Sequence, residues 1–219
     1  MLVRFFLLIP FLITFSVVTY SQEYESIEKA ALNYFIDLSA KNYNTGDDLS
    51  NLRNLLFKKY NFAEFESKYK ITENEFDSLK KRFDEFESIN KNISEDSALV
   101  LFNGWYLHLS NLFYHYSDKK FFSSDKVKIL LFSTSMSCHC TLEMCKNQTI
   151  DLLKFAKKNN LDYWIIDSYE HNELQIKFET YFAPSVIIFD AGNNILLKLE
   201  YDENMISKVN QLLLNKLKG

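Results

Sequence analysis

The chain is short of the two residues that most often form turns. Of its 219 residues, 4 are glycine and 2 are proline, whereas average usage would give about 15 and about 11. The scarcity of turn residues indicates a helix-rich protein. Arginine is also scarce, the formal net charge is −4 and the isoelectric point is near 5.6. Nucleic acid is therefore not an expected partner, because phosphate binding normally needs a basic patch or a basic domain.

Hydrophobic residues are plentiful by contrast. They make up 47% of the chain, which contains 20 phenylalanines and 13 tyrosines. Such a composition is too apolar and too aromatic for a disordered or collagen-like chain. A chain of this length forms one domain of ordinary size or two small ones. Cysteine is rare, and all three cysteines lie between Cys138 and Cys145, which makes this segment the most informative part of the sequence.

The N-terminal residues have the pattern of a secretory signal peptide. One positive charge, Arg4, precedes an apolar run from Phe5 to Val18, and the small residue Ser21 favours cleavage after it. We therefore expect a signal peptide over residues 1–21 and a periplasmic or secreted protein. An uncleaved membrane anchor is the alternative, because the run approaches the roughly 20 residues that a span needs. In either case clustered cysteines in an oxidising compartment must be paired, bound to a metal or kept reduced.

Residues 22–120 are expected to form a helical N-terminal region. Apolar residues recur there at spacings of three and four without any proline, and Thr72 with Glu75 forms a capping-box signature before an apolar stripe. The last helix is apolar nearly all round, which predicts burial on several sides. The pattern predicts helices near 23–42, 47–60, 72–91 and 96–117.

Residues 121–219 have a different pattern, which alternates short apolar runs with helical stretches. Runs of four to six apolar residues have the length of strands. We expect strands at 127–132, 163–166, 185–189 and 195–200, and helices at 142–159, 173–180 and 203–217. This order predicts an α/β sandwich with a mixed four-stranded sheet, in which a crossover helix joins two parallel strands and a hairpin joins the last two.

The cysteines fall between the first of these strands and the following helix. A thiol at a helix N-terminus faces unpaired N–H groups and the positive end of the helix dipole, which favour the thiolate. A protonated His139 would add to this effect. Such a thiolate attacks disulfides, and a second thiol resolves the product. Cys145 lies about 7.5 Å of helical rise beyond Cys140, so Cys138 with Cys140 is the feasible pair, in a small, easily reduced ring.

Two segments, 127–145 and 183–193, resemble the thioredoxin superfamily, and most closely its secreted TlpA/ResA-like branch. In that branch an apolar strand leads to Trp-Cys-x-x-Cys, two variable residues, Glu, one further residue and Pro. Here Glu143 stands at the Glu position and Cys145 at the position of that proline.

The motif also departs from that branch. Met136 replaces the Trp, Ser137 occupies the first-cysteine position, and Cys138 follows one residue late, giving Cys-His-Cys. The resemblance covers about residues 125–219 and excludes the helical region.

The resemblance implies a thioredoxin-like α/β/α sandwich that acts as a thiol–disulfide oxidoreductase on protein thiols or disulfides, without a cofactor. Cys138 and Cys140 would be the catalytic pair. Pro184 would be cis, and it would place the backbone of Ala183 against the cysteines, where substrate binds. The implied supporting residues are Ser137, His139, Glu143 and Cys145.

Two other functions stay open at this stage. One is copper binding or copper delivery by a thioredoxin-fold protein, because thiols, thioethers and an imidazole suit Cu(I) and, less well, Zn(II). The other is a thioredoxin-like interaction module without catalysis, which the serine at position 137 and the missing Trp favour. The potential metal ligands are Cys138, His139, Cys140 and Cys145, with Met136 and Met144 beside them.

Overall fold

The computed structural model describes residues 22–41 and 45–216. The expected signal peptide or anchor, residues 1–21, lies outside the described residues. Among the helices of the described part, none is both long and apolar enough to span a membrane.

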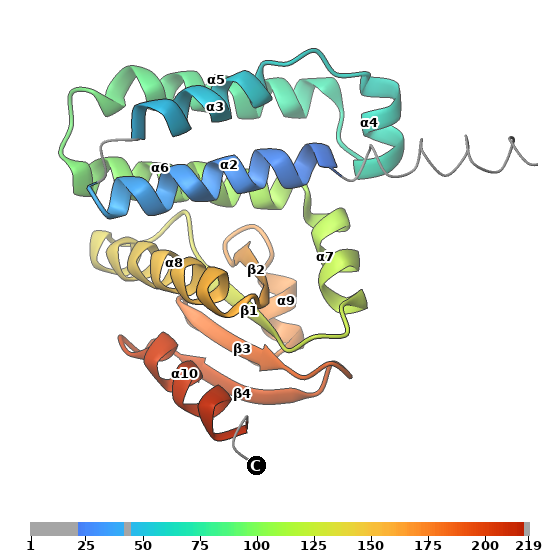
Figure 1. Ribbon diagram of the computed structural model, residues 1–219, viewed down its shortest axis with the longest axis vertical. Coiled ribbons are helices and arrows are strands. Elements are labelled where there is room, and N and C mark those ends of the chain that lie inside the picture. Colours follow the sequence, from blue (N-terminus) through green and yellow to red (C-terminus); the bar gives the residue numbers. More distant parts are fainter. Residues whose placement is uncertain (1–21, 42–44, 217–219) are drawn as a thin grey trace, which may run out of the picture.

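Six helices form the N-terminal part of the described chain, arranged above the sheet in Figure 1. The inner helices α2 and α6 lie between the outer helices α3 and α5 and the rest of the molecule, and α7 runs down one side. α6 contacts α2 and α5 as well as β2 and α8, so it is buried on several sides, as its composition predicts. The helices are α2 (Gln22–Ser39), α3 (Thr45–Leu56), α4 (Phe62–Tyr69), α5 (Glu73–Asn90), α6 (Glu95–Leu112) and α7 (Tyr114–Ser123).

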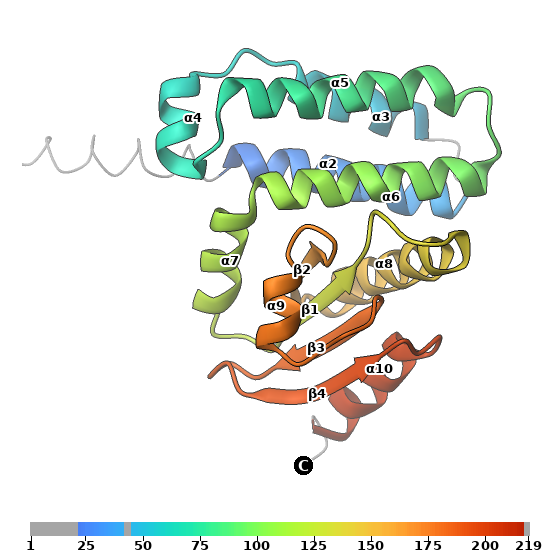
Figure 2. The ribbon, with the colours of Figure 1, turned by 180° about the vertical axis from the view of Figure 1, so that it is seen from behind.

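The remaining elements form a mixed sheet with three helices, visible from both sides in Figures 1 and 2. The strand order is β2-β1-β3-β4, with β1 parallel to β2 and antiparallel to β3, and with β3 antiparallel to β4. The strands are β1 (Lys128–Ser133), β2 (Asp162–Asp167), β3 (Ser185–Phe189) and β4 (Ile195–Glu200), and the helices are α8 (His139–Asn159), α9 (Asn172–Lys177) and α10 (Met205–Lys216). The α/β class and the mixed four-stranded sheet are confirmed, and the layout is that of a thioredoxin-like fold.

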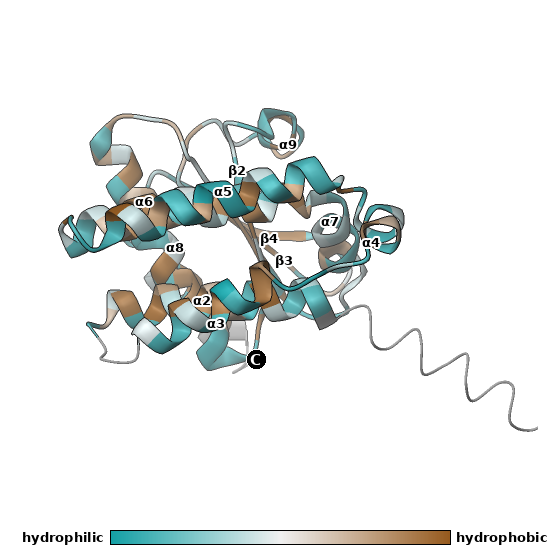
Figure 3. Ribbon diagram, turned by 90° about the horizontal axis from the view of Figure 1, so that it is seen from above, coloured by the Kyte–Doolittle hydropathy of each residue, from teal (hydrophilic) through white to brown (hydrophobic). Residues whose placement is uncertain are grey.

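Each face of the sheet is buried under helices. Because side chains alternate along a strand, Ile129 and Leu131 of β1 face α8 and α10, whereas Leu130 and Phe132 face α7 and α9. The first of these cores continues without a break into the helical layer, where it includes Phe102 of α6. Figure 3 shows the apolar colouring of β3 and β4 inside the molecule and hydrophilic colouring along the outer helices. The helical region and the sheet therefore share one hydrophobic core.

The helix boundaries correct the sequence prediction at two places. The helix predicted over 96–117 ends at Leu112, and Phe113 forms a corner before α7. Phe113 is fully buried, and its ring stacks on Tyr24 with 4.2 Å between centroids. Burial of this ring against α2 fixes the corner. α4 was not predicted. Tyr60 donates a hydrogen bond to the carbonyl of Leu55, which satisfies an acceptor at the end of α3 and separates the two helices.

Candidate functional site

The cysteine loop follows β1 and is held in place by polar contacts at the end of β2. The buried carboxylate of Asp167 accepts hydrogen bonds from the backbone N–H of Ser135 at 3.1 Å and of Tyr169 at 3.0 Å. The N–H of Ser168 donates to the carbonyl of Ser133 at 2.8 Å. These bonds join the ends of two parallel strands, and they fix the point from which the exposed loop leaves the sheet.

The loop delivers Cys138 to the N-cap position of α8, one residue before the first helical residue, His139. Cys138 and Cys140 are both exposed free thiols, and their sulfurs lie 2.8 Å apart. The Thr141 hydroxyl lies 3.2 Å from the Cys138 sulfur. The two cysteines that the spacing analysis pairs are therefore adjacent in the structure.

These contacts lower the pKa of the Cys138 thiol. The hydrogen bond with Cys140 is the largest cause that lowers its pKa, from 9.0 to about 6, followed by the side chain and then the backbone of Thr141. Hydrogen bonds to the thiolate stabilise it over the thiol. At pH 7 a thiol with this pKa is about nine-tenths thiolate. Ser137 makes a smaller contribution in the same direction.

Thr141 is a site residue that sequence reasoning missed. It is the N3 residue, three positions after the N-cap Cys138. The side chain of an N-cap residue normally accepts a hydrogen bond from the backbone N–H at N3. The spacing of three residues between Cys138 and Thr141 could therefore have identified Thr141 as a neighbour of the Cys138 sulfur. The apolar periodicity of α8 begins only at Leu142, and for that reason the helix start was predicted three residues late.

Cys145 occupies a different environment. It is fully buried, and burial raises the pKa of its thiol to about 11. Its sulfur faces Ser133 and the backbone N–H of Thr134 rather than the exposed pair. Cys145 therefore stands apart from the Cys138 and Cys140 thiols.

The two other supporting residues do not touch the thiols within the described part of the chain. His139 is exposed at the first position of α8. Glu143 forms an ion pair with the buried Lys146, whose ammonium also lies 3.5 Å from Asp96 of α6. Glu143 therefore belongs to a charge network that ties α8 to the helical layer.

The expected substrate loop lies across a groove from the cysteine loop. The Ala183–Pro184 bond is cis, as the resemblance implies, and Pro184 is buried directly before β3. A groove of 510 Å³ runs between Ser137 and Thr141 on one side and Ala183 on the other. The structure thus brings the two predicted segments, 127–145 and 183–193, to one surface.

Exposed apolar side chains line this groove and were not predicted. Tyr181 is 68% exposed and Phe182 62% exposed, although both are large and apolar. The carboxylate of Glu200 accepts hydrogen bonds from both of their backbone N–H groups, at 2.9 and 3.3 Å, and so holds their loop. Tyr201 and Met136 are also exposed and line the groove as well. The signal in the sequence was the aromatic pair directly before Ala183-Pro184.

The four side chains that were candidate metal ligands, Cys138, His139, Cys140 and Cys145, do not converge on one point. No group of three or more His, Cys, Asp or Glu side chains within residues 22–41 and 45–216 is arranged to hold a metal ion. The reason is geometric, because Cys145 points into the core while Cys138 and Cys140 face solvent.

The chain matches no protein-family model and no curated protein. Its likeness to the thioredoxin-like class therefore rests on the order of the mixed sheet, the helices around it, and the cysteine and proline loops at one surface. These features establish a fold that is compatible with that class.

Proposed function

We propose that this chain is a secreted or periplasmic thiol–disulfide oxidoreductase of the TlpA/ResA-like kind, which acts on protein disulfides through Cys138 and Cys140. One observation carries the proposal. Two exposed thiols lie with their sulfurs 2.8 Å apart at a helix N-terminus, and hydrogen bonds lower the pKa of one of them to about 6. This combination is what a nucleophilic thiol with a resolving partner requires.

The reaction consists of two thiol–disulfide exchanges. The Cys138 thiolate attacks one sulfur of a substrate disulfide, forms a mixed disulfide with it and releases the other sulfur as a thiolate. Cys140 then loses its proton and attacks the Cys138 sulfur, which forms the Cys138–Cys140 disulfide and releases the second substrate thiolate. Two electrons pass from the enzyme to the substrate. The same steps in reverse oxidise a substrate dithiol.

The groove between the two loops gives a protein substrate access to the attacking thiol. Its apolar lining, Tyr181 and Phe182 above all, favours polypeptide substrates over small disulfides because an extended chain buries these side chains. The partly buried Ala183 lines the groove together with Ser137 and Thr141, which flank the two thiols in the sequence. Its backbone is the proposed docking point for the substrate strand.

Trapping of the mixed disulfide tests the proposal. A Cys140→Ser variant keeps the attacking thiol and lacks the resolving one, so it should accumulate covalent adducts with a disulfide-containing protein such as oxidised ribonuclease. Non-reducing electrophoresis detects the adducts, and peptide mapping assigns them to Cys138. Cys145→Ser is the matched control, which removes a buried thiol and should trap nothing. If the reduced wild-type protein cleaves a protein disulfide no faster than free dithiol does, the proposal is wrong.

A further inference from the structure

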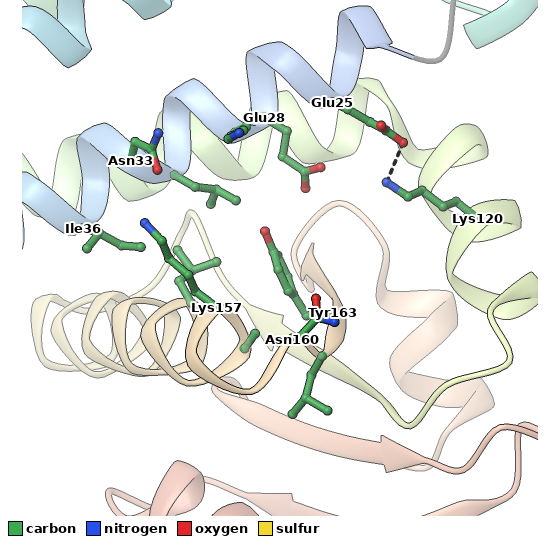
Figure 4. A pocket seen from close by; sticks show the side chains of 13 residues that line it. Glu25, Glu28, Asn33, Ile36, Lys120, Lys157, Asn160 and Tyr163 are labelled. Carbon is green, nitrogen blue, oxygen red and sulfur yellow. Dashed lines mark hydrogen bonds and ion pairs between the residues drawn. The ribbon is translucent and has the colours of Figure 1, made fainter. Parts of the chain in front are cut away.

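A second cavity lies far from the cysteines, between the helical layer and the sheet. It has a volume of 380 Å³, at the lower end of the range for small-molecule sites. Its walls come from α2, α7, the C-terminal end of α8 and β2, as Figure 4 shows. The thiol pair stands at the opposite, N-terminal end of α8. The cavity therefore has no part in the proposed thiol chemistry.

Glu28 places a carboxyl group in this cavity without a direct ion pair, although the charge of Lys120 acts on it from the edge of the cavity. The hydroxyl of Tyr106 lies 3.5 Å from it, and the hydroxyl of Tyr24 also hydrogen-bonds to it. No lysine or arginine in the described part of the chain comes within ion-pair distance of the carboxyl. Lys120 pairs instead with Glu25, at 2.8 Å, at the edge of the cavity. Burial raises the pKa of Glu28, and the charge of Lys120 and the hydrogen bonds from Tyr24 and Tyr106 offset this effect only in part.

The Tyr163 hydroxyl, beside Glu28, has no hydrogen-bond partner among the described residues. The Tyr163 side chain points into the cavity toward Glu28 in Figure 4. Its hydroxyl makes no hydrogen bond to any residue that the structure describes, and burial raises its pKa well above 10.0. Tyr163 is only partly buried, so its hydroxyl is accessible to a ligand that could hydrogen-bond to it. The carboxyl and the phenol together form a polar end to the cavity with unused acceptor capacity.

The opposite end of the cavity carries positive charge, and its walls are apolar. Lys157, an exposed residue near the end of α8, lines the cavity at this end, away from Glu28. The remaining lining is mostly aliphatic and includes the amides of Asn33 and Asn160. The larger aliphatic side chains are Leu32, Ile36, Leu153 and Leu161. Glu28 and Tyr163 therefore stand at one end, with Lys120 at its edge, Lys157 stands at the other end, and mostly aliphatic side chains lie between them.

We propose that this cavity binds a small zwitterion whose ammonium and carboxylate groups are separated by an apolar spacer. The ammonium supplies the direct ion pair that Glu28 lacks, and it donates to the Tyr163 hydroxyl. The carboxylate of the ligand pairs with Lys157 at the rim. The spacer covers the leucine and isoleucine side chains. A simple cation would meet the rim lysines, and a simple anion would meet Glu28, so only a molecule with both charges satisfies both ends.

Three probes of matched length test this assignment. 6-Aminohexanoate carries both charges, hexylamine lacks the carboxylate, and hexanoate lacks the ammonium. Calorimetric titration of the mature chain at about pH 8, where the ligand ammonium is charged, should show saturable binding of 6-aminohexanoate. Each single-charge probe should bind about tenfold or more weakly, because each lacks a charge-assisted hydrogen bond. No saturable binding of 6-aminohexanoate, or equal binding of all three probes, would overturn the proposal.

Three variants connect the binding to the cavity. Glu28→Gln and Tyr163→Phe should each weaken 6-aminohexanoate binding, Glu28→Gln by about tenfold or more. Lys157→Ala changes only an exposed residue, so it should fold normally, and it should bind 6-aminohexanoate and hexylamine equally. Lys158→Ala is the matched control, since that lysine is exposed beside Lys157 but does not line the cavity. If Lys158→Ala weakens binding as much as Lys157→Ala, the assignment is wrong. The assay involves no thiol, so its outcome is independent of the proposed oxidoreductase activity.

Discussion

Replacement of Thr141 by valine should raise the pKa of the Cys138 thiol and leave α8 in place. Valine has the shape of threonine but no hydroxyl, so the helix keeps a β-branched residue at the same position. The hydrogen bond to the Cys138 sulfur, 3.2 Å from the hydroxyl oxygen, is lost. The bond from the backbone N–H of residue 141 is kept. The change therefore isolates one contact among those that lower the pKa.

The size of the pKa change depends on how much the Thr141 hydroxyl contributes to the lowered pKa of Cys138. The pKa of Cys138 falls from 9.0 to about 6, through Cys140 first, then the Thr141 hydroxyl, then the Thr141 backbone. Loss of the second of these contacts should raise the pKa by about one unit, a moderate effect for a thiolate that stays in contact with water. At pH 7 the thiolate fraction would fall from about nine-tenths to about one half. Cys140→Ala, which removes the largest cause, should raise the pKa further.

The pH dependence of alkylation measures this pKa. The rate of reaction of Cys138 with iodoacetamide, assigned by peptide mass spectrometry, rises with pH as the thiolate forms. The wild-type midpoint should lie near 6, the Thr141→Val midpoint should be higher, and the Thr141→Ser midpoint should stay close to the wild type because serine keeps the hydroxyl. A wild-type midpoint near 9, or identical midpoints for valine and threonine, would show that the Thr141 hydroxyl does not lower the pKa of Cys138.

Three further predictions follow from other contacts. Cys145 should resist iodoacetamide at pH 8 in the native protein and react after unfolding, because it is buried and its pKa is raised to about 11; rapid native labelling would contradict its placement. Ser110→Ala should lower the free energy of unfolding in urea by about 1–2 kcal/mol, because the buried Ser110 hydroxyl donates to the carbonyl of Ile165 at 2.5 Å, and an unchanged midpoint would argue against that bond. The double change Tyr181→Ser and Phe182→Ser should raise KM for a protein disulfide several-fold without changing the rate with a small aromatic disulfide. An equal loss on both substrates would show that the aromatic pair acts on the thiols instead.

The sheet was predictable because its strands are short apolar runs, which are fully buried in β1 and β3 and partly buried in β4. Residues 185–189 and 195–200 match β3 and β4 in both bounds, since such runs have few other ways to bury their side chains. α4 was missed because it has only eight residues, and its apolar residues are aromatic rings that pack into a cluster rather than along one stripe. Propensity and periodicity are weak signals over so short a length.

The candidate site was predictable to the extent that it is local in sequence. The proximity of Cys138 to Cys140 follows from their spacing, which restricts the distance between the two residues. The role of Glu143 did not follow, because its partner Lys146 also approaches Asp96, a residue of a helix far away in the sequence. The cavity at Glu28 was not predictable at all. Tyr163 of β2 and Glu28 of α2 meet only after the helical layer packs against the sheet.

The packing of α6 against β2 also determines at which edge of the sheet a strand from another molecule can add. An outermost strand presents unpaired N–H and C=O groups, which can recruit a strand from another molecule and start aggregation. β2 is one of the two outermost strands, and α6 packs against it, with the Ser110 hydroxyl on the carbonyl of Ile165. Strand addition to the described sheet is thereby directed to β4. That strand carries Lys198 and Glu200, and charged side chains on an outer strand oppose pairing with a second copy. The packing that builds the cavity thus also protects one border of the sheet.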